Sequence, residues 1–431
     1  MSGILARARF LIFNPRFIAA PRYRDLRTRG VETRVQLRRV IWIALLAAWL
    51  GFVALSGRTP RGVAHAAAPA LPARCEDASA PDATLFLIGD AGAPRAPAEP
   101  LLDALAVEAS EMVRALGAER VAIAFLGDNV YPVGLRRPDH EGRAEDERRL
   151  DAQLAVVRRS GARGYLVPGN HDWDNGGADG WEAVKRQTRF VAARGALELP
   201  PDGCPGPVSA PLGARLGLIF IDTQWWLHEA ARPEGTSSGC AETNRAEIER
   251  ALAAMLRDAG DRRAIVLAHH PLRSGGPHGA RFGWKEHVFP FREMNRSLWI
   301  PVPVLGSIRH VARMLGVSPQ DVPSVAYQQM IQSIERGFAA APPLVYAAGH
   351  DHGLQVIRGD GAERFEVVSG AGSAPSLTWA HAIPGTLFAA AESGYARLDA
   401  HANGAVEVTI ETLDASGALA AAFRACLAER R

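Results

Sequence analysis

The sequence predicts an α/β fold in which helices cover a layered β-sheet. Short apolar runs, each bounded by turn residues, alternate along the chain with longer stretches of helical periodicity. Strands that alternate with helices in this way favour a sheet with helices packed on it. After Gly385 the pattern changes to alternating apolar and polar residues around Asn403-Gly404 and Ser416-Gly417, which predicts a terminal antiparallel meander. We therefore expect one domain from residue 83 to residue 431.

The predicted strands before the meander are Ala83–Ile88, Arg120–Leu126, Gly164–Val167, Leu216–Ile221, Ala264–Ala268, Leu344–Ala348 and Phe365–Val368. The predicted helices between them include Glu99–Leu116, Glu145–Arg159 and Asn244–Ala259. For the last helix we expect Thr243 as the N-cap and Gly260 as the C-cap. The meander strands are expected at Tyr395–His401, Ala405–Leu413 and Ala420–Cys426.

A long segment, residues 281–337, interrupts this pattern. It contains Phe289-Pro290-Phe291 and the apolar run 298–305, whose prolines exclude a regular helix there. We interpret the segment as an insertion with three alternatives: a lid over a functional site, a patch at a membrane surface, or a packed excursion of the core.

The N-terminal segment differs from the rest of the chain in charge. Residues 1–68 hold twelve Arg against Asp25 and Glu32, a net charge of +10, so residues 69–431 sum to −7 in a chain of net charge +3. An acidic domain disfavours nucleic acid as a partner.

Residues 40–56 (VIWIALLAAWLGFVALS) form an uncharged apolar run of 17 residues. This length is close to the minimum of about 17 for a spanning helix. We expect a transmembrane signal anchor, or a signal peptide cleaved near Ala64-His65-Ala66. The basic residues 1–39 would remain cytoplasmic, and the domain would be exported to the periplasm or the extracellular side, beyond an Ala/Pro-rich linker at 57–82.

Four cysteines in a chain destined for an oxidising compartment permit two disulfides, in three possible connectivities. We expect Cys204 to pair with Cys240, because both lie in Gly/Pro/Ser-rich loops that flank one predicted strand. Cys75 would then pair with Cys426 and join the two ends of the domain. Free thiols are the alternative.

Polar motifs follow five of the predicted strands directly. They are Gly89-Asp90-Ala91-Gly92, Gly127-Asp128-Asn129-Val130-Tyr131, Gly169-Asn170-His171-Asp172, Val266-Leu267-Ala268-His269 and Gly349-His350-Asp351-His352. In open α/β sheets, ligands bind just beyond the carboxyl ends of the strands. Singly, each motif has another interpretation, such as a turn residue for Asp90 or a core His pair for His269. Together they predict one site.

The side chains of these motifs offer oxygen and nitrogen donors without a thiolate. The candidate metal ligands are Asp90, Asp128, Tyr131, Asn170, His269, His350 and His352. Such donors suit iron, manganese or zinc. They are too many for one catalytic ion with an open position, so we expect two ions that share a carboxylate. Two ions about 3.5–4 Å apart can hold a bridging hydroxide and grip the oxygens of a phosphoryl group.

Taken in this order, the motifs resemble those of the purple acid phosphatases, of the tartrate-resistant acid phosphatase type, within the calcineurin-like metallophosphoesterase superfamily. The resemblance covers roughly residues 82–375 and extends to the surrounding sequences GNHDWD and HHPLRSGGPHG. It implies a four-layer αββα sandwich. Ala91 stands where an aromatic residue is frequent in the family, a departure that would alter packing more than metal binding.

The resemblance also implies the roles of individual residues. One ion, Fe(III), would be held by Asp90, Asp128, Tyr131 and His352, and a second ion, Fe, Zn or Mn(II), by Asp128, Asn170, His269 and His350. Asp128 would bridge the two ions. The catalytic residues would be His171, which hydrogen-bonds the phosphate, and His278, which helps to protonate the leaving group.

The expected function is hydrolysis of phosphoric monoesters, on phosphorylated small molecules or phosphoproteins. A phosphodiesterase or nucleotide pyrophosphatase with the same site is one alternative, and a non-catalytic, membrane-tethered scaffold is another. We interpret His270 as a structural residue near the site. We expect Trp225-Trp226 in the core rather than at a substrate platform.

Overall fold

The computed structural model describes residues 71–76, 80–293, 298–302, 304–414 and 416–429. The chain divides into two units, Met1–Leu55 and Ser56–Arg431, and all described residues belong to the second. The predicted span 40–56, the basic segment before it and the linker up to residue 70 lie outside the described residues. Among the described helices, none combines the length and the apolar character that a bilayer crossing requires.

The described residues form a mixed α/β fold with two seven-stranded sheets, which confirms the predicted α/β class. The first sheet has the strand order β14-β13-β12-β1-β2-β3-β4, in which β1 to β4 are parallel and β12 to β14 antiparallel. Its strands are β1 (Pro81–Ile88), β2 (Val121–Leu126), β3 (Arg163–Val167), β4 (Leu197–Glu198), β12 (Gly394–His401), β13 (Val406–Leu413) and β14 (Leu419–Ala428).

The second sheet has the order β11-β9-β10-β8-β7-β6-β5, with a parallel centre formed by β6, β7, β8 and β10. Its strands are β5 (Val208–Leu212), β6 (Leu216–Phe220), β7 (Arg263–Leu267), β8 (Val345–Ala348), β9 (Leu354–Arg358), β10 (Phe365–Ser369) and β11 (Thr386–Ala390). The pattern of apolar runs did not predict β4, β5 or β11, which lie at sheet edges, and it did not predict β9, which lies inside the second sheet.

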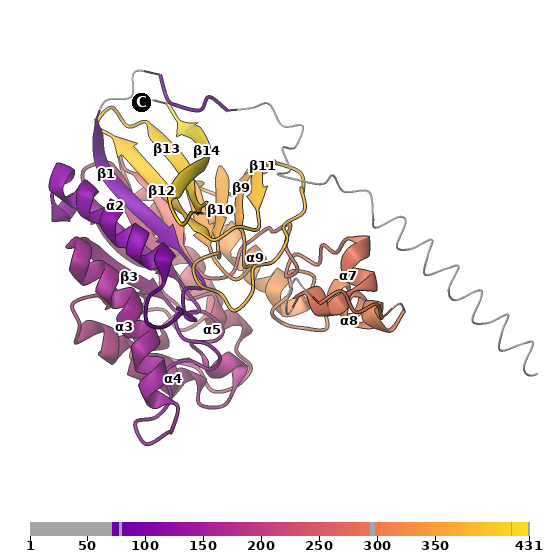
Figure 1. Cartoon of the computed structure of the whole chain (residues 1–431). Coiled ribbons are helices and arrows are strands. Elements are labelled where there is room, and N and C mark those ends of the chain that lie inside the picture. Colours follow the sequence, from indigo (N-terminus) through magenta and orange to yellow (C-terminus); the bar gives the residue numbers. More distant parts are fainter. Residues whose placement is uncertain (1–70, 77–79, 294–297, 303, 415, 430–431) are drawn as a thin grey trace, which may run out of the picture. The chain divides into compact units, whose positions relative to one another are not determined.

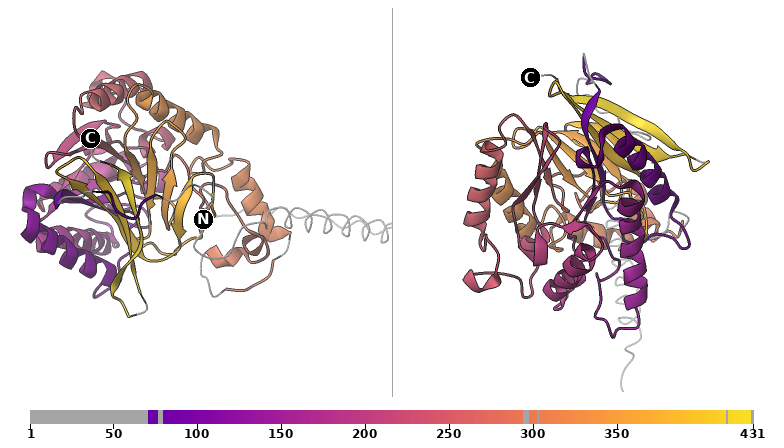
Figure 2. Two further views of the ribbon diagram at one scale, coloured as in Figure 1. Left: turned by 90° about the horizontal axis from the view of Figure 1, so that it is seen from above. Right: turned by 90° about the vertical axis from the view of Figure 1, so that its left-hand side faces the viewer.

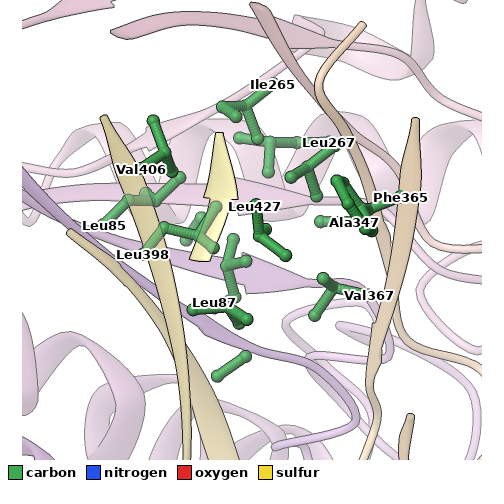
Figure 3. Close-up of a cluster of buried hydrophobic side chains, with 14 of the residues drawn as sticks. Leu85, Leu87, Ile265, Leu267, Ala347, Phe365, Val367, Leu398, Val406 and Leu427 are labelled. Atoms are coloured by element: carbon green, nitrogen blue, oxygen red, sulfur yellow. The ribbon is translucent and has the colours of Figure 1, made fainter. Parts of the chain in front are cut away.

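The main hydrophobic cluster lies between the two sheets (Figure 3). Leu85 and Leu87 of β1 belong to this cluster together with Ile265 and Leu267 of β7, whereas Phe86 of β1 faces a second cluster. Successive strand residues point to opposite faces, so the second half of β1, Leu85 to Ile88, is apolar without interruption because both of its faces are buried. Each fully buried Leu contributes about 1.5–3 kcal/mol of transfer free energy.

Helices pack on the other face of each sheet (Figures 1 and 2). The first sheet is covered by α2 (Pro100–Leu116), α3 (Arg143–Ser160) and α4 (Gly180–Ala192), and the second by α5 (Gln224–Leu227), α6 (Arg245–Arg257) and α9 (Val325–Phe338). Trp225 and Trp226 of α5 are buried in the cluster beneath these helices. Short 3-10 turns connect the elements at Ala118–Arg120, Asp174–Gly176, Pro201–Gly203, Thr236–Ser238 and Pro290–Glu293.

The expected caps of α6 were wrong at both ends. The N-cap is Asn244, whose side chain accepts a hydrogen bond of 3.1 Å from the backbone N–H of Glu247, and the C-cap is Asp258. Thr243 instead donates from its hydroxyl to the carboxylate of Glu247 at 3.0 Å. Asn244 is the N-cap because its short side-chain amide reaches the backbone N–H of the third helical residue. Thr243 therefore lies one position before the N-cap.

The segment 281–337 has two different parts. Its second part contains most of α9, which buries Tyr327, Met330 and Ile334 in the core cluster of the second sheet. Its first part contains α7 (Trp284–Val288) and α8 (Leu305–Met314), which lie to the side of the sheets in Figure 1. The α9 part is therefore a packed excursion of the core.

Two disulfides join distant parts of the domain. Cys75 is bonded to Cys426 of β14, and Cys204 is bonded to Cys240. Disulfides are typical of oxidising compartments, so both bonds favour an exported domain.

Candidate metal centre

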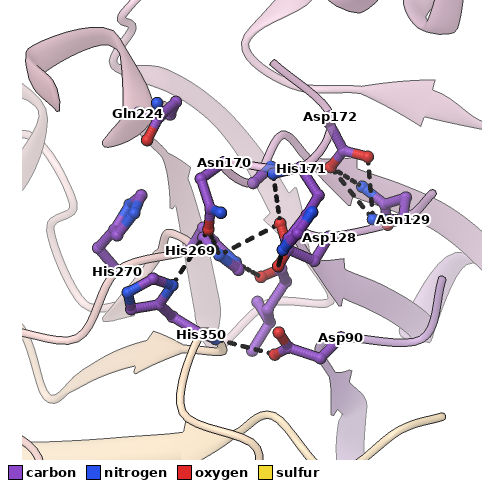
Figure 4. A network of polar contacts seen from close by, with 12 residues as sticks. Asp90, Asp128, Asn129, Asn170, His171, Asp172, Gln224, His269, His270 and His350 are labelled. Atoms are coloured by element: carbon purple, nitrogen blue, oxygen red, sulfur yellow. Dashed lines mark hydrogen bonds and ion pairs between the residues drawn. The ribbon is translucent and has the colours of Figure 1, made fainter. Parts of the chain in front are cut away.

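The five polar motifs meet where the carboxyl ends of the parallel strands of both sheets come together (Figure 4). Asp90 follows β1, and the backbone N–H of His350, which follows β8 in the other sheet, donates to its carboxylate at 2.8 Å. The N–H of Gly349 donates to the carbonyl of His269 at 2.9 Å. The first hydrogen bond holds the ends of the two sheets in contact, and the second joins two neighbouring strand ends of the second sheet, so residues far apart in the chain share one site.

Three of the predicted ligands have a left-handed backbone. The φ angles are 56° for Asp90, 55° for Asp128 and 68° for His350. Such a conformation costs a non-glycine residue of order 1–3 kcal/mol and clusters at functional sites. The chain therefore turns sharply at each of these three residues, just beyond the end of a strand.

Glycines beside these residues provide the space that the site needs. Gly127 has a φ of 88°, and a Cβ atom there would lie 2.4 Å from Nδ1 of His269. At Gly169 a Cβ would lie 2.3 Å from both the backbone nitrogen and Oδ1 of Asp128. Only glycine fits at either position, because the site packs directly on the backbone.

Each of the three candidate His ligands has one ring nitrogen hydrogen-bonded to a backbone carbonyl. His269 Nδ1 lies 2.8 Å from the carbonyl of Leu126, His350 Nε2 lies 2.9 Å from that of Gln320, and His352 Nδ1 lies 2.8 Å from that of Ser376. A carbonyl only accepts, so these nitrogens carry the protons. The opposite nitrogen of each ring is then a lone-pair donor, as in metal-binding His residues whose orientation is fixed by such contacts.

The lone-pair nitrogens of His269 and His350 converge on Asn170. His269 Nε2 lies 3.1 Å and His350 Nδ1 lies 3.2 Å from Oδ1 of Asn170, and Oδ1 of Asp128 is 3.5 Å from the same nitrogen of His269. Burial lowers the pKa of both His residues, so their facing nitrogens are unprotonated. Buried acceptors that face one another without a hydrogen between them cost about 1–3 kcal/mol each. A cation among them would remove that cost.

A second group of donors surrounds Tyr131. Its hydroxyl donates to Oδ1 of Asp90 at 3.0 Å and lies 3.1 Å from Nε2 of His352, which is itself 3.5 Å from the Asp90 carboxylate. Burial and the charge of Asp128 raise the pKa of Asp90 well above its usual range, and burial lowers that of His352 to about 4. A nearby positive charge would lower the pKa of Asp90 again and would keep His352 unprotonated, so both groups would be in the state that binds a metal ion.

The donor set therefore fits metal ions. All seven predicted ligands lie together as carboxylate, amide, phenol and imidazole donors, and donor atoms of Asp90, Asp128 and His269 lie within 4.8 Å of one another. The mixture matches hard or borderline ions rather than a thiolate-binding metal.

His270 also lies close to His269 and His350, within the same 4.8 Å limit, but both of its ring nitrogens are engaged. Nδ1 is 2.8 Å from Oγ1 of Thr223, and Nε2 is 2.7 Å from Oε1 of Gln320. We therefore exclude His270 from the ligand set. The group of Cys75, Cys426 and Glu429 is not a metal site either, because its two sulfurs form a disulfide.

The two predicted catalytic His residues flank the centre. The backbone N–H of His171 donates to Oδ1 of Asp128 at 2.9 Å, and its Nδ1 lies 2.6 Å from the carbonyl of Pro132. The ring of His278 packs against that of His350, with centroids 3.8 Å apart and an interplanar angle of 40°. His278, His350 and His352 line a cavity of about 150 Å³ together with Arg309, Arg313 and Ser376.

Sequence reasoning missed the partners of His278. Its Nδ1 lies 2.9 Å from the carboxylate of Asp321 and 3.0 Å from the carbonyl of Gln320. The Asp321 carboxylate in turn accepts hydrogen bonds from Nε and Nη2 of Arg313. Burial would raise the pKa of Asp321, but hydrogen bonds from His278 and Arg313 hold it below its usual range. No motif marks Asp321, which lies in an irregular loop, so no local signal could have identified it.

Asp172 stabilises the loops that carry the candidate ligands. Its buried carboxylate accepts hydrogen bonds from the backbone of Gly169, Asn129 and Val130 and from the side chain of Asn129. It thereby ties the loop after β3 to the loop after β2. Its place in the GNHD motif was a usable signal for this role.

Comparisons with known proteins do not assign a family. No protein-family model matches the chain, and no curated protein sequence does. Among solved structures, GAP50, the anchor in the inner membrane complex of Plasmodium, is similar at 16% identity and a TM-score of 0.46, over 81% of this chain and 89% of that one. The 5'-nucleotidase from Candida albicans is similar at 11% identity and a TM-score of 0.34, over 81% of this chain and 55% of that one.

Proposed function

We propose that the chain is an exported, metal-dependent phosphoric monoester hydrolase with the four-layer αββα sandwich of the purple acid phosphatases. The observation that carries this proposal is the set of three His residues, each fixed by a backbone carbonyl at one nitrogen and facing carboxylate or amide oxygens with the other. The three hydrophobic clusters, one between the sheets and one under each helix layer, support the layer order.

Two groups of side chains would hold the ions. Asp90, Asp128, Tyr131 and His352 would form one site, with Fe(III), and Asp128, Asn170, His269 and His350 the other, with Fe, Zn or Mn(II). When bound, the ions would lower the pKa of a coordinated water and offset the negative charge of the phosphoryl oxygens.

The chain's own residues would orient the substrate and move a proton. Nδ1 of His171 is engaged by the backbone carbonyl of Pro132. Nε2 is therefore the nitrogen that can donate a hydrogen bond to a phosphate oxygen, when it also carries a proton. Nδ1 of His278 is engaged by the carboxylate of Asp321 and the backbone carbonyl of Gln320. Nε2 is therefore the nitrogen that can protonate the leaving oxygen. A positioned acid of this kind contributes typically ~10²–10⁴-fold to the rate.

Metal analysis of the purified chain, combined with phosphate release from an aryl phosphate, tests the proposal. We expect two ions per chain, and we expect His269→Ala to lose an ion and most activity. His140→Ala is the matched control, because His140 is exposed and lies outside the site. A chain that binds no ion, or that keeps full activity as His269→Ala, would contradict the proposal.

A panel of substrates then separates the alternatives. Monoesters should be hydrolysed faster than diesters or nucleotide anhydrides if the enzyme is a monoesterase. A chain that holds both ions and cleaves none of these esters or anhydrides would instead favour the membrane-tethered scaffold. The partners of the enzyme would be phosphorylated small molecules or phosphoproteins, and the membrane through residues 40–56.

A further inference from the structure

Exposed apolar side chains are concentrated in the segment that contains α7 and α8. Ten of the fourteen large apolar side chains that are exposed in the described residues lie between positions 284 and 317. They are Trp284, Phe291, Leu298, Trp299, Ile300, Ile308, Val311, Met314, Leu315 and Val317, and we call this surface the α8 face. Exposed apolar side chains concentrated in one segment in this way are typical of interaction sites.

The polarity of α8 is inverted relative to an ordinary surface helix. Ile308 is 61% exposed and Leu315, which directly follows the helix on the same side, is 76% exposed, whereas Ser307 and His310 are buried. The buried side contacts α7, because Oγ of Ser307 lies 3.1 Å from Nδ1 of His287 and the rings of His287 and His310 are 5.2 Å apart. Residues three, four and seven positions apart share a helix face. The seven-residue spacing of Ile308 and Leu315 therefore places both apolar side chains on the outward side of α8.

The same segment is basic in an acidic domain. Residues 281–317 contain six Arg or Lys against two Glu, a net charge of +4, so the rest of residues 69–431 sums to −11. Arg281 and Arg309 are exposed in this segment, and Nζ of Lys285 lies 5.9 Å from the ring centroid of Trp299. Apolar and aromatic residues mixed with Arg and Lys are the composition of surfaces that bind at the headgroup level of anionic membranes.

We propose that the α8 face docks on the surface of a bilayer with anionic headgroups. Two further observations favour lipid over a second copy of the chain. A copy would bring two surfaces of like charge together, whereas anionic lipid is complementary. The predicted span 40–56 would also hold the domain at the same membrane, through a short linker.

Docking would place the candidate active site at the membrane surface. Arg309 and Arg313 of α8 line the same cavity as His278, His350 and His352. The proposal does not depend on the reaction, and its test uses no activity measurement.

The test uses the full chain in lipid nanodiscs, with Leu315→Cys carrying an environment-sensitive dye. All four native cysteines form disulfides, so the new thiol is the only site for labelling. We expect a blue shift of the dye emission, and loss of emission with quencher-bearing lipids, in nanodiscs that contain anionic lipid. Zwitterionic nanodiscs should give a smaller effect.

Val107→Cys is the matched control, because Val107 is an apolar residue of α2 that is 54% exposed. Its dye should show no quenching. Adding Ile308→Glu to the Leu315→Cys chain should abolish the quenching, and since Ile308 is exposed, the change leaves the core intact. Absence of quenching at position 315 in anionic nanodiscs overturns the proposal, as does a blue shift that depends on protein concentration and not on lipid, which would indicate a second copy.

Discussion

At the scale of single residues, the side chains of the candidate site pack directly against the backbone, which leaves no space for a Cβ atom at the neighbouring glycines. Gly127 shows this most directly, because the ring of His269 occupies the space that a Cβ atom of residue 127 would need. Gly117 offers a comparison, because it has a similar φ of 92° but nothing within 4 Å of its would-be Cβ.

We therefore expect Gly127→Ala to destabilise the fold and to weaken metal binding. Gly117→Ala should cost about 1–3 kcal/mol, from backbone strain alone. Gly127→Ala adds a collision that displaces His269 from the carbonyl of Leu126, so its cost should be larger by about 1–3 kcal/mol. Urea denaturation and metal content of both variants provide the measurement, and equal costs with equal metal content would contradict this account.

A substitution of Asp321 tests the proposed role of His278 as the general acid. Asp321→Asn removes the charge beside His278 Nδ1 and keeps the hydrogen bond from that nitrogen to the carbonyl of Gln320. We expect kcat for an aryl phosphate to fall by about 10–10²-fold with KM little changed, and the pH profile of kcat to shift, because a general acid depends on its proton affinity. The exposed Asp139→Asn is the control, and an unchanged pH profile would reduce Asp321 to a structural role.

At the scale of elements, the strands carry the site and the helices cover them. Strand β1 sends alternate residues into two different clusters, and Asp90 follows immediately where the strand ends. Helix α6 is held at its start by a reciprocal pair, in which Asn244 accepts from the N–H of Glu247 and the Glu247 carboxylate accepts from the N–H of Thr243 at 2.8 Å.

We expect Asn244→Ala to lower the free energy of unfolding by about 0.5–2 kcal/mol, the usual cost of losing an N-cap. Thr243→Ala should cost less, because the backbone N–H of Thr243 still donates to Glu247 after its hydroxyl is removed. Chemical denaturation of the two variants compares them directly. A larger loss for Thr243→Ala would restore Thr243 as the effective cap.

At the scale of the whole domain, two covalent bonds connect segments that are remote in sequence. Cys75 and Cys426 are separated by 351 residues, whereas Cys204 and Cys240 are separated by 36. The first bond attaches the segment before β1 to β14, so it closes nearly the entire domain.

Loss of the Cys75–Cys426 bond should be the more destabilising. Loop-closure entropy of the unfolded chain predicts a stabilisation about 2 kcal/mol larger for the longer loop. The paired variants Cys75→Ser with Cys426→Ser, and Cys204→Ser with Cys240→Ser, should differ in this direction in thermal and chemical denaturation. The reverse order would show that local packing around Cys204 matters more than chain entropy.

Strand positions and the order of the polar motifs were readable from the sequence, because burial on both faces and sharp turns after strands leave local signals. The α/β class, the main parallel strands and the meander followed from those signals, whereas β4, β5, β9, β11 and the α6 caps did not. Only the tertiary structure decided that Gln320 and Asp321 meet His278, that each candidate His presents a particular nitrogen, and that α8 turns its apolar side outward. Those facts depend on contacts between residues that are distant along the chain, and local sequence carries no record of which distant groups fold against it.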